Sequence, residues 1–190
     1  VDADEIILEM QQNASKLSDD LGKISDFSVE EKNILNKQVG LAALKYYILK
    51  VDPKKRILFD PVGSIDFNGN TGPFIQYTYA RIQSLIMRDN FEPNTSDLSI
   101  IINDKEKELI QFLIEFPEAI KSAGNNYSPA IIANYVYELV KSYNSYYQSN
   151  SILKVSNLDL KNLRLNISYK VGIVIKKSMS LLGIEVPNKM

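Results

Sequence analysis

The 190-residue sequence has no cysteine, no histidine and no tryptophan. Without cysteine there is neither a disulfide framework nor a thiol nucleophile, and without histidine there is no imidazole base or imidazole metal ligand. Any chemistry would rest on carboxylates, lysines, tyrosines or hydroxyls. The composition therefore favours a binding module over a complete enzyme.

Membrane and export signals are missing as well. No apolar run approaches the roughly eighteen residues that suggest a membrane span, and the acidic opening VDADEIILEM lacks the basic start of a signal peptide. We therefore expect a cytoplasmic protein with no membrane partner. Because the chain begins with Val, we also expect it to be part of a longer protein.

Charges of opposite sign gather at the two ends of the chain. Residues 1–35 hold nine acids and three bases, a net charge of −6, whereas residues 141–190 hold eight bases and two acids, a net charge of +6. Such asymmetry indicates a polyanionic partner at the C-terminal end. A solvated basic helix face is the alternative interpretation.

Helix signals dominate the rest of the sequence and predict an all-α fold. Capping boxes begin at Ser28 and Asn103, each with a glutamate three residues later. Ser128-Pro129 starts another helix, and Gly183 can adopt the left-handed conformation that ends the last one. The expected helices cover 3–21, 28–50, 128–147 and 158–182, with others beginning near residues 72 and 103.

A segment rich in Gly, Pro, Asn and Asp, DPVGSIDFNGNTGP at residues 60–73, follows a short strand-like run, RILF at 56–59. We expect two helices before this loop and about five after it. The prediction is an N-terminal helical segment over 1–66, packed as a separate layer, and a helical bundle over 67–190. The loop matches neither a calcium-binding loop nor a glycine-rich phosphate loop, so we expect no metal or cofactor in this chain.

Two aromatic segments are candidates for binding. Phe74, Tyr77 and Arg81 follow one another at i, i+3 and i+7 and so lie on roughly one helix face. Tyr147 ends a later helix beside a polar tail, and we expect its ring and that of Tyr77 to be solvent-facing platforms. Rings beside a basic region suit single-stranded RNA, because rings stack on bases and cations attract phosphates. The alternative is core packing. That is our interpretation of one stripe on the helix at 129–149: Tyr135, Leu139, Tyr143 and Tyr146.

The segment FNGNTGPFIQYTYARIQSLI, residues 67–86, resembles the C-terminal part of the arginyl-tRNA synthetases, where the family pattern is close to GNTGPYLQYAHARI. VGLAALKY at 39–46 is similar to the family's VGxxAxKY, and SLLGIEVPNKM at 180–190 is similar to LLGIxxPxxM. Further matches lie between them, at 106–110, 116–118 and 134–139. The motifs keep the family's order over nearly the whole chain.

The resemblance implies a DALR-type anticodon-binding bundle from about residue 72 to the end, joined through the preceding helices to a class I catalytic domain. The residues that it places around the anticodon loop of tRNA(Arg) are Phe74, Tyr77, Arg81, Tyr147 and Met190. Two positions depart from the family pattern. Phe74 replaces a Tyr and loses its hydroxyl, and Tyr79 replaces a His.

The resemblance also implies a monomeric parent enzyme that attaches arginine to tRNA(Arg) with ATP and Mg. The family's ATP-binding motifs are missing here, so this chain alone should not activate arginine. One alternative is a free-standing helical adaptor or tRNA-binding protein with the same fold, which the opening Val disfavours. Another is the related bundle of cysteinyl or glycyl synthetases, which the motifs GNTGPFIQY and LLGI disfavour.

Overall fold

The computed structural model describes residues 2–21, 27–93 and 100–190. Within these ranges every regular element is a helix, which confirms the predicted all-α fold. The seven helices of the described ranges are α1 (Ala3–Leu21), α2 (Val29–Leu49), α3 (Pro61–Ser64), α4 (Gly72–Asp89), α5 (Asp104–Asn125), α6 (Pro129–Ser149) and α7 (Leu158–Leu181).

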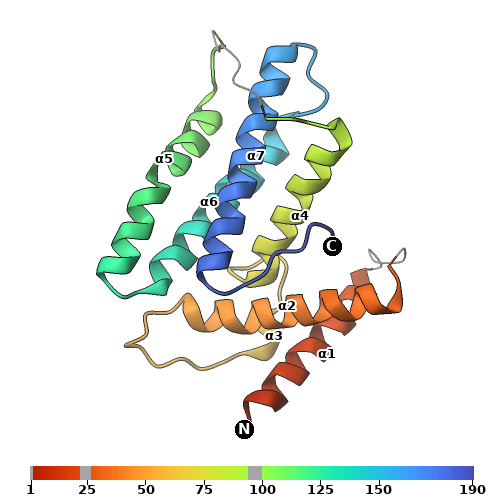
Figure 1. Cartoon of the computed structure of the whole chain (residues 1–190), viewed down its shortest axis with the longest axis vertical. Helices are drawn as coiled ribbons and strands as arrows, with labels where there is room; N and C mark the ends of the chain where they lie inside the picture. The colour runs from red at the N-terminus through yellow and green to blue at the C-terminus, as the bar shows by residue number, and fades with distance from the viewer. Residues whose placement is uncertain (1, 22–26, 94–99) are drawn as a thin grey trace.

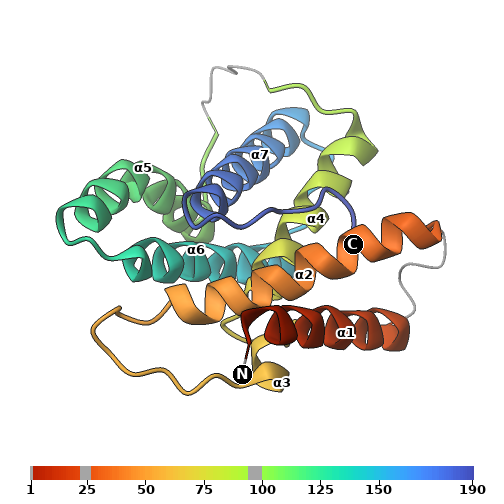
Figure 2. The same cartoon turned by 60° about the horizontal axis from the view of Figure 1, so that its bottom comes forward.

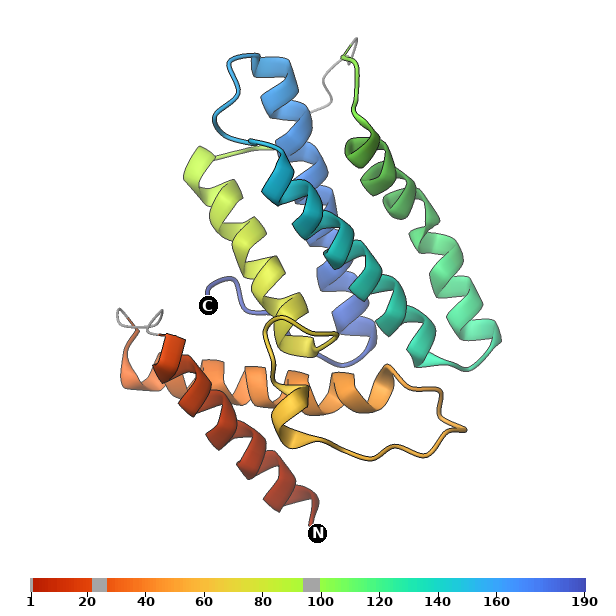
Figure 3. The same cartoon turned by 180° about the vertical axis from the view of Figure 1, so that it is seen from behind.

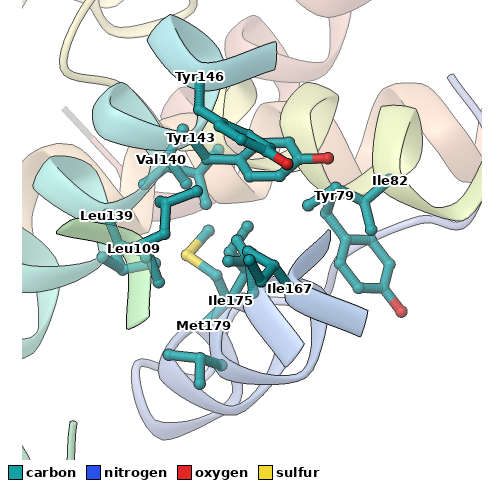
Figure 4. Close-up of a cluster of buried hydrophobic side chains, with 14 of the residues drawn as sticks. Tyr79, Ile82, Leu109, Leu139, Val140, Tyr143, Tyr146, Ile167, Ile175 and Met179 are labelled. Atoms are coloured by element: carbon teal, nitrogen blue, oxygen red, sulfur yellow. The ribbon is translucent and has the colours of Figure 1, made fainter. Parts of the chain in front are cut away.

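The helices α4, α5, α6 and α7 form a bundle (Figure 1). Its core lies between α6 and α7, where Tyr143 and Tyr146 of α6 face Ile167, Ile175 and Met179 of α7 (Figure 4). All five side chains are buried. The stripe predicted along α6 is therefore confirmed as packing for Leu139, Tyr143 and Tyr146, which are fully buried.

The first two helices lie side by side across one end of the bundle (Figures 2 and 3). Two glycines allow close backbone contact, one between α1 and α2 and one between α2 and α4 of the bundle. A Cβ on Gly40 of α2 would lie 2.8 Å from the backbone of Met10 in α1, and one on Gly72 of α4 would lie 2.4 Å from the carbonyl oxygen of Ala42 in α2. A second apolar cluster, which includes Met10, Leu35, Val39 and Ile65, fills this layer. The division between residues 66 and 67 remains a prediction.

Local capping chemistry sets most helix starts. The boxes predicted at Ser28 and Asn103 are both present, with Glu31 and Glu106 as the reciprocal partners. Ser128, by contrast, makes no side-chain capping hydrogen bond, so only Pro129 in the first turn marks that start.

The loop at 60–73 contains an element that the sequence analysis missed. The side chain of Asp60 accepts hydrogen bonds from the backbone N–H groups of Val62 and Gly63 and so caps the short helix α3. After this loop the described ranges contain four helices, where about five were expected. The run at 56–59 is not a strand, because no neighbouring segment pairs with it; Tyr47 instead donates its hydroxyl hydrogen to the carbonyl of Leu58.

After α7 the chain turns at Gly183, which has the predicted left-handed backbone (φ 67°). The tail that follows, residues 183–190, runs back past α4 toward α2 (Figures 1 and 2). Lys45 of α2 donates to the carbonyl of Gly183 over 2.6 Å, and Tyr79 of α4 donates to the Asn188 side chain over 3.3 Å. These contacts place the terminal residue, Met190, beside α4.

Candidate nucleic-acid interface

A small pocket of about 210 Å³ lies where α4, the end of α6 and the C-terminal tail meet. Pockets that enclose drug-sized ligands measure roughly 300–1,000 Å³, so this one is smaller than such a site. We call it the α4–α6 pocket. Its lining residues are Tyr77, Ala80, Arg81, Ser84, Leu85, Arg88, Tyr147 and Met190.

Arg81 lines this pocket and lies between two tyrosine rings. Its guanidinium carbon is 4.9 Å from the ring centre of Tyr77 and 5.2 Å from that of Tyr147. Both distances are within the roughly 6 Å range of a cation–π contact. Two residues of α4 and one of α6 therefore form a single stacked group, although seventy residues separate the two rings in the sequence.

Both tyrosines are half-buried. The ring of Tyr147 packs on Tyr143 at a centroid distance of 6.2 Å, and Tyr77 meets Phe67 edge-on at 6.0 Å. The expectation that both rings are solvent-facing platforms is therefore wrong in part, since each ring packs against a neighbouring ring of the chain. The same contacts hold the rings rigidly at the pocket.

The structure brings together four of the five residues that the sequence analysis selected: Tyr77, Arg81, Tyr147 and Met190. The fifth, Phe74, does not line the pocket. Its ring lies 6.1 Å from that of Tyr137 and packs against the bundle core. Phe74 lies about two helical turns before Arg81 on α4. It therefore meets α6 at Tyr137, well before the level of Tyr147.

Arg88 is the charged residue among the four lining residues that were not selected from the sequence. Tyr77, Arg81, Ser84 and Arg88 recur every three or four residues on α4 and so form one stripe, which the helical period could have revealed. With Arg81 and Arg88 the pocket carries two guanidinium groups, no acidic side chain lines it, and the single terminal carboxylate of Met190 offsets one of the two charges at most. The pocket is thus electropositive and aromatic.

The basic C-terminal segment is partly neutralised. Three of its eight bases pair with acids that precede residue 141: Lys141 with Glu138, Lys161 with Asp89, and Arg164 with Glu106. The last pair is 2.8 Å apart, and its carboxylate is almost fully buried. The field that reaches solvent from this segment is therefore weaker than its sequence charge of +6 suggests.

Tyr79, one of the two expected departures from the family pattern, is not part of the pocket. Its ring is buried in the bundle core, and burial raises the pKa of its hydroxyl. Its hydroxyl contacts the tail at Asn188. The residue thus supports the tail and keeps the terminal residue near the pocket.

Among the described residues, no group of three or more acidic side chains is arranged to hold a metal ion. None of the described helices combines the length and apolarity needed to cross a membrane.

The bundle and its electropositive aromatic pocket define a helical binding domain. The chain belongs to the DALR anticodon binding domain family, whose pattern matches residues 75–190. Over its whole length it is 56% identical to the arginine–tRNA ligase of Flavobacterium psychrophilum and 49% identical to that of Parabacteroides distasonis. It spans about a third of the length of these curated relatives, 31% and 32% respectively.

A solved structure agrees with these sequence matches. The arginyl-tRNA synthetase of Thermus thermophilus superposes on the whole chain with a TM-score of 0.91 and 29% identity, and 32% of that protein is covered. The arginyl-tRNA synthetase of Plasmodium falciparum shares the fold, with a TM-score of 0.84 at 23% identity. The resemblance to the arginyl-tRNA synthetases is confirmed.

Proposed function

We propose that this chain is the C-terminal, anticodon-binding region of an arginine–tRNA ligase and that the α4–α6 pocket receives a base from the opened anticodon loop of tRNA(Arg). The observation that carries the proposal is the position of Arg81 between Tyr77 and Tyr147. A flat, electropositive group of this kind fits an unstacked base and the phosphate beside it. Met190 forms the wall on the tail side, and Phe74 supports α4 from within the bundle.

The physical basis is stacking combined with charge. One base on an aromatic ring is worth about 1–3 kcal/mol, and a guanidinium next to the ring adds attraction for the phosphate backbone. Because the rings are already held by Tyr143 and Phe67, little side-chain freedom is lost when RNA binds.

The chain spans about a third of its relatives, so the activity of the whole enzyme is part of the proposal. We expect a catalytic domain outside this chain to hold ATP and Mg and to join arginine to tRNA(Arg). This chain alone should show no arginine-dependent exchange of pyrophosphate into ATP. We also expect the full enzyme to be cytoplasmic and monomeric.

Titration of labelled tRNA(Arg) with the chain, followed by fluorescence anisotropy, tests the proposal. Wild-type chain should bind tRNA(Arg) more tightly than a tRNA of different anticodon, and Tyr77→Ala should weaken binding by about 1–3 kcal/mol. Tyr127→Ala is the matched control, because Tyr127 is 89% exposed in the turn between α5 and α6 and does not line the pocket. Equal affinity for both tRNAs, or equal losses in the two variants, would overturn the proposal.

A further inference from the structure

Asn144 lies on α6, one turn before Tyr147, and its half-buried side chain faces α4. Its Oδ1 accepts a hydrogen bond from Nη1 of Arg81. Its Nδ2 donates to Oγ1 of Thr78 over 2.8 Å and to the carbonyl oxygen of Val140 over 3.0 Å. One amide thus connects Arg81 with the backbone of α6.

Only one orientation of this amide satisfies all of its partners. The carbonyl of Val140 can only accept, so the nitrogen of Asn144 must face it. Thr78 donates its hydroxyl hydrogen to the carbonyl of Phe74 over 3.0 Å, so its oxygen must accept from Asn144. The remaining group, Oδ1, is left for a donor, and Arg81 supplies it. The chain of hydrogen bonds therefore has a fixed direction.

We infer that Asn144 is a positioning residue for RNA binding: it holds the guanidinium of Arg81 between the rings of Tyr77 and Tyr147 before RNA arrives. The inference rests on the proposed function of the α4–α6 pocket. An arginine side chain free in solution samples many rotamers, and ordering it on binding costs affinity. Asn144 removes part of that cost because the guanidinium is already anchored at the spacing that both cation–π contacts require.

Asn134 serves as the control for a role in packing alone. It lies ten residues earlier on α6 and makes the same bond to the carbonyl four residues before it, from Nδ2 to Ala130 over 2.8 Å, and a longer bond to the carbonyl of Lys50 over 3.4 Å. It lies away from the pocket and does not line it. Asn134→Ala therefore removes the same bond to the helix backbone without touching Arg81.

The test is a set of binding titrations of the chain with the anticodon stem-loop of tRNA(Arg). Asn144→Ala should weaken binding by about fivefold, the size expected when one cation–π arrangement is released, whereas Asn134→Ala should leave binding unchanged. In an Arg81→Ala background, Asn144→Ala should have no further effect. Asn144→Leu, which keeps the side-chain volume, should behave like Asn144→Ala and serves if the alanine variant folds poorly.

A second readout needs no RNA. The side-chain Nε–H of Arg81, followed by ¹⁵N relaxation in the free chain, should be ordered in the wild type and in Asn134→Ala but mobile in Asn144→Ala.

The outcomes distinguish the two ideas. If wild-type chain does not bind the stem-loop, the proposed function fails and the inference with it. If Arg81→Ala weakens binding but Asn144→Ala does not, or if the losses are additive, only the positioning role is overturned.

Discussion

The side-chain nitrogen of Gln76 donates to the backbone carbonyl of Glu185 over 2.8 Å and so fastens the C-terminal tail to α4. The same nitrogen lies 3.3 Å from the carbonyl oxygen of Gln38 in α2. Gln76 is fully buried, so three segments meet at one amide that water does not reach. Gln76 therefore links the tail and the N-terminal layer to the bundle, and it is the sequence neighbour of Tyr77.

Gln76→Leu should release the tail while keeping the side-chain volume. The carbonyl of Glu185 loses its donor, whereas that of Gln38 keeps the hydrogen bond within its own helix. The free energy of unfolding should therefore fall by about 1–3 kcal/mol. Carboxypeptidase should then remove Met190 faster than from the wild type. Gln83→Leu on the same helix is the control, since Gln83 lies beside Gly172 of α7. Unchanged removal of Met190 would show that Gln76 does not hold the tail.

Alkaline pH should destabilise the bundle through its buried tyrosines. Burial raises the pKa of Tyr46, Tyr143 and Tyr146, so the folded chain holds these protons more tightly than the unfolded chain, whose tyrosines titrate near pH 10. Their contribution to the free energy of unfolding is present in full below about pH 10 and is lost as the pH rises above that value. Urea unfolding at a series of pH values should show this fall.

Tyr146→Phe should reduce the decrease in the free energy of unfolding between neutral and alkaline pH. Among the described residues the Tyr146 hydroxyl is buried without a hydrogen-bond partner, so its removal should not lower stability at neutral pH. Tyr135→Phe is the comparison, because the Tyr135 hydroxyl donates to the carbonyl of Phe112 over 2.6 Å and its loss should cost about 1 kcal/mol. Equal effects of the two variants at neutral pH would contradict this assignment.

The ion pair of Arg164 and Glu106 should stabilise the bundle far more than a surface pair does. Glu106 is 1% exposed and also closes the capping box of α5. Arg164→Leu leaves the carboxylate of Glu106 buried without its ion-pair partner, which should lower the free energy of unfolding by about 3–5 kcal/mol. Lys121→Leu breaks a pair with Glu118 that is largely exposed, and should cost at most about 1 kcal/mol. Urea unfolding of the two variants measures both losses. Similar losses of stability in Arg164→Leu and Lys121→Leu would show that the buried pair is worth no more than the surface pair.

We expect Tyr147 to contribute mainly to RNA binding and Tyr135 mainly to the stability of the bundle. Tyr147→Ala should weaken stem-loop binding by about 1–3 kcal/mol, with a modest loss of stability because one side of the ring packs on Tyr143. Tyr135, which stacks on Phe116, lies outside the pocket, so Tyr135→Ala should lower stability more and leave binding unchanged. Binding titrations and thermal unfolding of both variants check this. A greater loss of stability in Tyr147→Ala would assign that ring to the core.

Features that depend on a few neighbouring residues could be predicted from the sequence. The capping boxes at Ser28 and Asn103 and the left-handed Gly183 are local, because a side chain or a glycine acts on the backbone within one helical turn. The core stripe of α6 followed from helical period alone. The short helix α3 was missed although Asp60-Pro61 is a start signal, because the glycines around it indicated a loop.

Features that depend on distant segments could not be predicted. The helix α2 packs against α1 on one side and α4 on the other, so no single apolar stripe describes it: Ile34 and Ile48 fit the helical period of its apolar residues and yet are 54% and 46% exposed. Helical spacing grouped Phe74 with Tyr77, but only the position of α6 decides that Phe74 faces Tyr137. The bond between Arg81 and Asn144 spans 63 residues, and no local pattern encodes it.

The most direct test of the central claim is to map the RNA contact by NMR, with the anticodon stem-loop of tRNA(Arg) added to ¹⁵N- and ¹³C-labelled chain. We predict that the largest changes in chemical shift occur at the residues lining the α4–α6 pocket, above all Tyr77, Arg81, Tyr147 and Met190. The groove between α2 and the tail, lined by Lys37, Lys45 and Glu185, should change little. Largest changes in that groove, with an unaltered α4–α6 pocket, would contradict the account.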